Sequence, residues 1–306
     1  MSFNTDAAPQ MIERLYREDR LSIDEKNNIN LLVLHEGETP DLPMMQFMRT
    51  LPQWYKLVSA GDLVQVIEHK RITVKFQPIV SLRERSVYGY ECLSRGLTAD
   101  GDVIPPDKLF PQAKSLGLLF NLDRIARENA IQTAARHGVT DHIFINLLPA
   151  AIYDPEYCLR TTVAVAEESG LDYHRLVFEI VESERFGDVD HLKTILRHYR
   201  ARGVKTALDD VGSGYSSLNT LAELQPDIMK LDMGLIRDIA KDSMKQSILT
   251  GLEQIARDNG ILLLAAGVET DEELNFRKGR DIDLMQGYRF SPPRDEPDYV
   301  FPEELS

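Results

Sequence analysis

Residues 204–232, VKTALDDVGSGYSSLNTLAELQPDIMKLD, contain the pattern that decides the fold. Two short apolar runs, at 204–210 and 227–232, stand on either side of a helical pattern at 217–224. A short apolar run bounded by turn residues is typical of a strand that is buried on both faces. A strand, a helix and a second such strand therefore predict parallel pairing, with helices covering the sheet.

The same alternation continues on both sides of this stretch. Further strand-like runs lie at 142–148, 175–181, 261–268 and 284–290. Further helical patterns lie at 106–116, 122–136, 156–169, 190–202, 235–258 and 271–278. The first two strand-like runs are ITVKFQPIV (72–80) and VYGYECLSR (87–95), and the polar turn at 83–86 separates them. Because no helix intervenes, these two runs predict an antiparallel hairpin.

We predict an α/β fold of the (β/α)8 TIM-type barrel class, with an antiparallel strand at its start. The number of strand and helix units exceeds what a small open sheet needs, although an open doubly wound sheet is the alternative. Residues 1–69 mix short helical patterns with Gly and Pro breaks and predict a helical N-terminal extension. The barrel would then occupy residues 70–296, with a C-terminal tail at 297–306. The extension is interpreted as a cap or dimer contact, and a sensory role is the alternative.

Composition and charge restrict the classes of partner. The net charge of −14 disfavours DNA or RNA, because such a surface repels a phosphate backbone. It still allows a small anionic ligand, because bound metal ions can reverse the field inside one cleft. No apolar run approaches the roughly 20 residues that membrane insertion requires. The first residues lack a secretory signal, and the two cysteines fit a reducing compartment, so we predict a cytoplasmic protein.

Polar side chains stand toward the carboxyl ends of the predicted strands. They are Glu91, Asn146, Glu179, Asp209, Asp210, Lys230, Asp232, Glu269 and Gln286. Any one of them has a plainer explanation, since an Asp after a strand often caps a helix. In a parallel barrel, however, these ends meet at the face where barrel enzymes carry their chemistry. Several carboxylates there would repel one another unless cations neutralise them, and oxygen ligands favour Mg²⁺ or Mn²⁺ over zinc.

The chain resembles the EAL-domain family of cyclic di-GMP phosphodiesterases across about residues 70–295. The motifs that carry the resemblance occur in the family's order. They are FQPIV (76–80), ECLSR (91–95), FINLLP (144–149), FEIVES (178–183), LDDVGSGYSSL (208–218), IMKLD (228–232), GVET (267–270) and MQGYRFSPP (285–293). The resemblance implies the barrel fold, cyclic di-GMP as the substrate and the linear dinucleotide pGpG as the product.

The resemblance also implies a role for each matching position. The metal ligands would be Glu91, Asn146, Glu179, Asp209 and Asp210. The residues that hold or support the attacking water would be Lys230 and Asp232. The residues that seat the substrate would be Gln77, Arg95 and Gln286. The residues that position the loop at 211–217 would be Glu182 and Glu269. Asp209 would bridge two Mg²⁺ or Mn²⁺ ions, and such a pair can activate water and stabilise both oxygens of an in-line displacement.

One position departs from the family. The usual Ala-Glu-Gly-Val-Glu run appears here as residues 265–269, AAGVE, so Ala266 stands where the family has a glutamate. That glutamate would be a ligand of the second metal or the base that activates water, and alanine can be neither. Losing a general base typically costs about 10²–10⁴-fold in rate. Either the protein is naturally a poor enzyme that binds cyclic di-GMP as a receptor, or Ala266 was introduced to trap substrate in an active parent enzyme. Cys92 replaces the family's usual Ala, a small apolar change that we expect to be mild.

Three functions of different classes follow. The first is a metal-dependent phosphodiesterase that Ala266 impairs, with its second metal weakened. The second is an inactive receptor for cyclic di-GMP, and the third is a protein-interaction module that has lost the ligand. Retention of Arg95, Asp209, Asp210 and Lys230 speaks against the third. No cyclase-like sequence is present, so we do not expect synthesis of the dinucleotide, and a homodimer is a further possibility.

Overall fold

The computed structural model describes residues 8–18, 20–34, 39–40, 48–180, 189–212, 218–276 and 279–302. The chain forms two compact units. One comprises Met1–Arg71 with Gly96–Leu122, and the other comprises Ile72–Arg95 with Asp123–Ser306. The predicted domain boundaries at residues 69 and 296 remain a prediction.

The second unit is built on a closed barrel of eight strands. They are β3 (Ile72–Ser81), β4 (Ser86–Leu97), β6 (His142–Leu147), β7 (Leu176–Ile180), β8 (Lys205–Val211), β9 (Ile228–Leu231), β10 (Leu262–Ala265) and β11 (Leu284–Gln286). Neighbours follow the order β3, β11, β10, β9, β8, β7, β6 and β4, and β4 pairs with β3 again. Strands β4 and β6 to β11 are parallel, whereas β3 is antiparallel to β11. The predicted TIM-type barrel is confirmed, and the open sheet is wrong.

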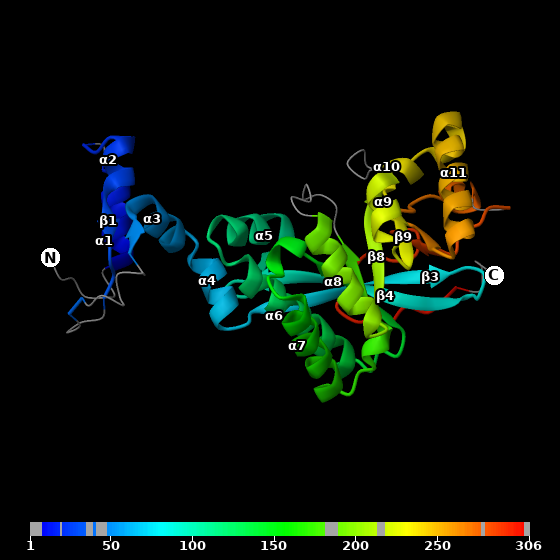
Figure 1. Ribbon diagram of the computed structural model, residues 1–306, viewed down its shortest axis with the longest axis horizontal. Coiled ribbons are helices and arrows are strands. Elements are labelled where there is room, and N and C mark those ends of the chain that lie inside the picture. The colour runs from blue at the N-terminus through cyan, green and yellow to red at the C-terminus, as the bar shows by residue number, and fades with distance from the viewer. Residues whose placement is uncertain are drawn as a thin grey trace. The chain divides into compact units, whose positions relative to one another are not determined.

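Helices connect the parallel strands and lie outside them (Figure 1). They are α6 (Leu119–Arg136), α7 (Pro155–Glu168), α8 (Val189–Ala201), α9 (Leu218–Leu224), α10 (Met233–Ile236), α11 (Ser243–Asn259) and α12 (Asp271–Phe276). Local chemistry sets their ends. Asp154 accepts from the backbone N–H of Tyr157 at the start of α7, and Gly260 ends α11 with φ of 66°. No helix among the described residues combines the length and the apolar character that crossing a membrane requires.

The barrel interior contains a layer of apolar side chains from seven strands. This layer comprises Ile79, Phe144, Val177, Ala207, Ile228, Leu264 and Leu284. Side chains two residues apart on a strand point to the same face. Asn146, Glu179, Asp209, Lys230 and Gln286 each lie two residues beyond a member of this layer, on the carboxyl side. The alternation of the strands therefore stacks the predicted site directly on the apolar core.

The first unit contains short helices and a two-residue ribbon. Its elements are α1 (Ala8–Tyr16), α2 (Ile23–Asn28), β1 (Asn30–Leu31), β2 (Arg49–Thr50), α3 (Leu51–Ser59), α4 (Gly61–Glu68), β5 (Val103–Ile104) and α5 (Pro106–Ser115). The rings of Tyr16 and Tyr55 stack with centroids 3.8 Å apart, and the Nε1–H of Trp54 donates to the carbonyl of Leu31 at 2.9 Å. These contacts join α1 and the ribbon to α3.

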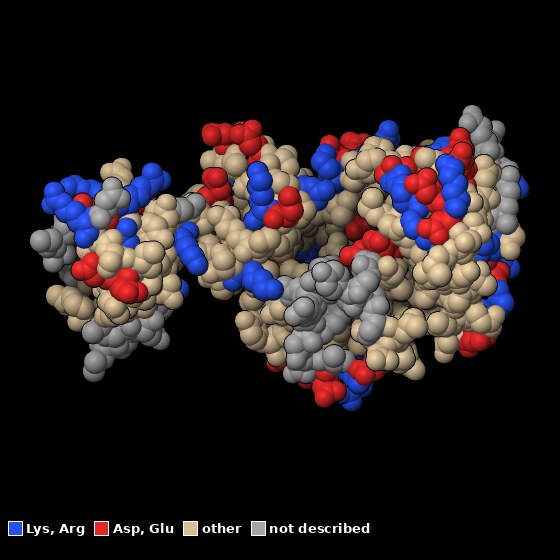
Figure 2. Space-filling model, turned by 90° about the horizontal axis from the view of Figure 1, so that it is seen from above, with Lys and Arg blue, Asp and Glu red and all other residues tan. Residues whose placement is uncertain are grey.

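The described surface carries charges of both signs. On the face drawn in Figure 2, Lys and Arg side chains lie among Asp and Glu side chains over both units. The net charge of the whole chain is −14.

Candidate functional site

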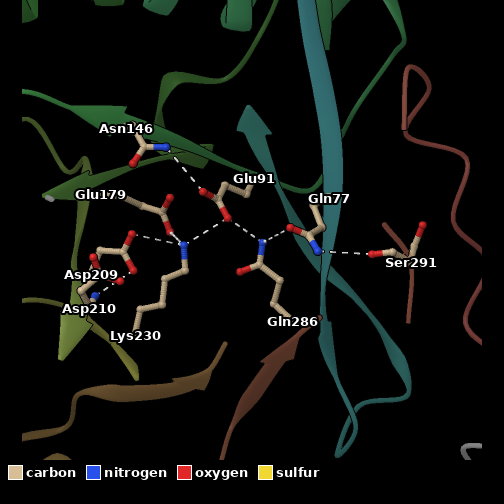
Figure 3. Close-up of polar contacts among 9 residues, drawn as sticks. All are labelled: Gln77, Glu91, Asn146, Glu179, Asp209, Asp210, Lys230, Gln286 and Ser291. Atoms are coloured by element: carbon tan, nitrogen blue, oxygen red, sulfur yellow. Dashed lines mark hydrogen bonds and ion pairs between the residues drawn. The ribbon is translucent and has the colours of Figure 1, made fainter. Parts of the chain in front are cut away.

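The ammonium group of Lys230 lies at the centre of the polar side chains that stand above the apolar layer of the barrel. Its Nζ is 3.1 Å from Glu91 Oε2, 3.0 Å from Glu179 Oε1 and 3.5 Å from Asp209 Oδ2 (Figure 3). These four side chains come from β4, β7, β8 and β9, which lie within one run of neighbouring strands in the barrel. Lys230 and Glu179 are buried, and only 5% of Lys230 is exposed. We call Glu91, Glu179, Asp209 and Lys230 the central cluster.

A chain of amide side chains holds Glu91 from its other side. Gln286 Nε2 donates to Glu91 Oε2 at 2.6 Å and to Gln77 Oε1 at 3.2 Å. Gln77 Nε2 in turn donates to the carbonyl of Ser291 at 3.3 Å (Figure 3). Asn146 Nδ2 lies 3.4 Å from the second oxygen of Glu91. Both oxygens of Glu91 are thus oriented by neutral donors as well as by Lys230.

Burial and mutual charge govern the protonation of the central cluster. Burial would raise the pKa of Glu91, but Lys230 and the hydrogen bond from Gln286 outweigh it and lower that pKa. Burial, followed by the charge of Glu91, raises the pKa of Glu179 well above its usual value. Burial disfavours the charged form of Lys230, yet Asp209, Glu179 and Glu91 raise its pKa well above its usual value. The ammonium is therefore the fixed positive charge of the site.

Asp210 lies beside the central cluster in an uncommon backbone conformation. Its φ is 57°, and its N–H donates to Asp209 Oδ1 at 2.9 Å. Such left-handed backbone at a non-glycine residue is often found at functional sites. Burial, and then Asp209 and Asp232, raise the pKa of Asp210 to about 6. The two adjacent carboxylates are thus held close enough to repel each other.

The donor set suits a hard divalent cation. Carboxylate and amide oxygens of Glu91, Asn146, Glu179, Asp209 and Asp210 are the ligand types that Mg²⁺ and Mn²⁺ prefer. Glu179 Oε2 is buried and has no hydrogen-bond partner among the described residues, which leaves an acceptor oxygen available to an ion. Within the described ranges, however, no three His, Cys, Asp or Glu side chains already surround a point where a metal would sit. The residues therefore fit such an ion in chemistry, and some of them would have to move to bind it.

Some predicted site residues lie outside the central cluster. Arg95 donates to the carbonyl of Ser94 at 2.9 Å, and Asp232 caps α10 by accepting from the N–H of Gly234 at 2.9 Å. Glu269 was predicted at a strand end, but it lies beyond β10 and pairs with Arg237 through two contacts of 2.8 Å. Glu182 and most of the loop at 211–217 fall outside the described residues. The roles assigned to all these side chains remain predictions.

Sequence reasoning missed the residues that fix the loop between β10 and α12. Glu273 Oε2 accepts from the N–H groups of Glu269 and Thr270, at 2.8 and 3.1 Å, while Thr270 Oγ1 accepts from the N–H of Glu273 at 3.2 Å. This reciprocal arrangement is a capping box, and the Thr-x-x-Glu spacing of residues 270–273 could have revealed it. Arg237, which contacts both glutamates, has no comparable local signal.

Ala266 lies in the same layer as the polar side chains. It stands two residues beyond Leu264 of the apolar layer and extends the ladder by donating its N–H to the carbonyl of Leu231 at 3.3 Å. Gly267 then turns the chain with φ of 72°, and a Cβ at that position would collide with Met233. The loop therefore presents position 266 to the barrel mouth, with only a methyl group there.

Known proteins share this barrel. The EAL domain family matches residues 60–293. A cyclic di-GMP phosphodiesterase of Escherichia coli K12, PdeF, is 30% identical over 242 residues, which are 78% of this chain and 32% of that protein. An uncharacterised signalling protein of Caulobacter vibrioides is 33% identical over 235 residues, 76% of this chain and 29% of its own length. The chain thus spans about a third of the length of these two relatives.

Solved structures agree with the family match. A standalone EAL protein of Vibrio cholerae O395 with bound cyclic di-GMP is 39% identical, with a TM-score of 0.69 over 77% of this chain and 98% of that one. The manganese and cyclic di-GMP complex of BlrP1 from Klebsiella pneumoniae is 26% identical, with a TM-score of 0.67 over 83% of this chain and 70% of that one. The predicted resemblance is confirmed, and the chain belongs to the EAL domain family, in which several matched relatives are named cyclic di-GMP phosphodiesterases.

Proposed function

We propose that the chain binds cyclic di-GMP at the barrel mouth and carries a metal-dependent phosphodiesterase site that Ala266 impairs. The parent reaction would be hydrolysis of cyclic di-GMP to linear pGpG. The observation that carries the proposal is the central cluster itself, four ionisable side chains from four strands, three of them buried, with one methyl group in the same layer. A cytoplasmic location and a homodimer remain predictions.

The described residues can be assigned to three tasks in this reaction. Glu91, Asn146, Glu179 and Asp209 would hold a first Mg²⁺ or Mn²⁺, and Asp209 and Asp210 would contribute to a second. When bound, such ions activate water and stabilise charge on the phosphoryl oxygens. Lys230 would hold the attacking water by donating to it, because its ammonium is the fixed positive charge among these oxygens. Gln77 and Gln286 would keep Glu91 in its orientation.

Ala266 also favours a second function, that of a cyclic di-GMP receptor. A methyl group can neither bind a cation nor accept a proton, whereas the remaining polar residues of the mouth are retained. Ligand binding with little turnover would fit that combination. The two functions differ in what a glutamate at position 266 would restore.

The decisive experiment compares the chain with Ala266→Glu in a hydrolysis assay with Mg²⁺ or Mn²⁺. We expect the variant to form pGpG at least about tenfold faster, a conservative value for a restored general base. Ala240→Glu, on the segment between α10 and α11, is the matched control and should not change the rate. Negligible turnover by both forms, with binding retained, would favour the receptor. Absence of binding at micromolar cyclic di-GMP would sink both functions and leave the protein-interaction module.

A further inference from the structure

The position of the Lys230 ammonium has a consequence for ion binding. It contacts one oxygen each of Glu91, Glu179 and Asp209, within 3.0–3.5 Å. These three carboxylates are also among the proposed ligands of a divalent ion at this site. An ammonium and a divalent ion held by the same three carboxylates would repel each other, because both are positively charged.

Burial strengthens the interaction of the Lys230 ammonium with these carboxylates. Glu179 is fully buried and Glu91 is 7% exposed, so water cannot screen the repulsion between their charges. The ammonium compensates that repulsion while no metal is bound. One oxygen of the cluster stays without a donor: Glu179 Oε2 has no hydrogen-bond partner among the described residues.

We propose that Lys230 is the resident counter-cation of the site and that a divalent ion binds by displacing its ammonium from Glu91 and Glu179. The inference rests on the proposed function, because it takes these carboxylates as the ion's ligands. Lys230 then sets the metal affinity, in addition to contacting the reacting water. Its contacts with the carboxylates stabilise the fold when no ion is bound. An ion must break these contacts, so they lower its affinity.

Ala266 favours the Lys230 ammonium over a divalent ion at this site. A glutamate in the same layer would add a negative charge, and added negative charge attracts a doubly charged ion more than a singly charged ammonium. With alanine at position 266, the carboxylates favour the Lys230 ammonium over a divalent ion. The impairment ascribed to Ala266 would thus include weaker ion binding, in addition to any lost base.

The test measures Mn²⁺ binding by calorimetry and thermal unfolding with and without Mn²⁺, using the full chain without dinucleotide. We expect Lys230→Met to unfold at a lower temperature without metal and to bind Mn²⁺ at least about tenfold more tightly, within the range typical of coupled binding equilibria. Lys230→Arg keeps the charge and should show no such gain. Lys245→Met is the matched control, because Lys245 donates to the carbonyls of Gly234 and Arg237 and lies outside the central cluster.

A second measurement needs no destabilised variant. In the wild-type chain, Mg²⁺ should shift the side-chain ammonium resonance of Lys230, identified by its loss in Lys230→Arg. A resonance that stays unchanged while calorimetry shows Mg²⁺ binding would overturn the inference, as would Lys230→Met binding Mn²⁺ no more tightly than wild type. Either result leaves the proposed function intact. Failure of every form to bind Mn²⁺ would overturn both.

Discussion

Gln286 is the residue on which the orientation of Glu91 depends most directly. Its Nε2 donates at once to the carboxylate of Glu91 and to Gln77 Oε1, and only 3% of its surface is exposed. A hydrogen bond to a buried charged group contributes more than one between neutral groups, because the acceptor loses its hydration on burial. Gln286 is therefore a positioning residue for a proposed metal ligand, in addition to the substrate contact that the family resemblance implies.

Gln286→Met tests this role with little change in volume. We expect the free energy of unfolding to fall by about 1.5–3 kcal/mol, the range for a lost hydrogen bond to a charged partner. Mn²⁺ should also bind more weakly, because Glu91 is no longer fixed. Urea unfolding and calorimetry check the two effects. The control is Gln254→Met on the exposed face of α11, and an equally small effect of both substitutions would contradict the assigned role.

The loop between β10 and α12 is the element that carries position 266, and the first turn of α12 fixes it. Glu273 accepts two backbone N–H groups of this loop, and its other oxygen lies 3.6 Å from Arg237. Arg237, in the segment that follows β9, also forms an ion pair with Glu269. Because the Glu273 side chain is only 4% exposed, its contacts with the loop are shielded from water, whereas the Arg237–Glu269 pair is exposed. The loop is thus held from both ends.

Glu273→Ala should loosen this loop. We expect a loss of about 1–2 kcal/mol in the free energy of unfolding, as for removal of a helix cap. In the Ala266→Glu background it should also reduce the gain in turnover, because the new carboxylate would be less well placed. Glu272→Ala is the matched control: its ion pair with Lys241 is exposed, so solvent screens it and its loss should hardly change the free energy of unfolding. Equal losses in the two variants would refute the special role of Glu273.

At the scale of the whole molecule, the barrel follows from local signals, but the centre of its site does not. Short apolar runs predicted the strands, and their parallel pairing in a barrel predicted that Asn146 and Glu179 would meet at one face. The contacts of Lys230 join residues 139 and 51 positions apart in the chain, so only the folded barrel reveals them. Glu269 was misplaced because β10 ends at Ala265 and Gly267 then turns the chain away. The ribbon β1–β2 was missed because two-residue strands have no periodicity to detect.

A second polar group lies inside the same barrel and involves the first residues of two strands. The ring of His142 stacks on Tyr88 at 4.4 Å. Its Nε2 lies 2.9 Å from Lys205 Nζ, and its Nδ1 lies 3.2 Å from the carbonyl of Tyr88. The ammonium can only donate, so Nε2 accepts and the proton of the neutral ring is on Nδ1. Burial first, and then Lys205, lower the pKa of His142 to about 4.

This lowered pKa makes global stability depend on pH. Between about pH 6.5 and pH 4 the unfolded chain binds a proton at His142 that the folded chain does not, so the free energy of unfolding falls as pH decreases through that window. We expect a contribution on the order of 1 kcal/mol, because solvent partly screens the ring. Urea unfolding at pH 7.5 and pH 4.5 should show a smaller acid loss in His142→Gln than in wild type. Lys205→Met should reduce the loss without removing it, since burial is the larger cause. Parallel pH profiles for wild type and His142→Gln would disprove the linkage.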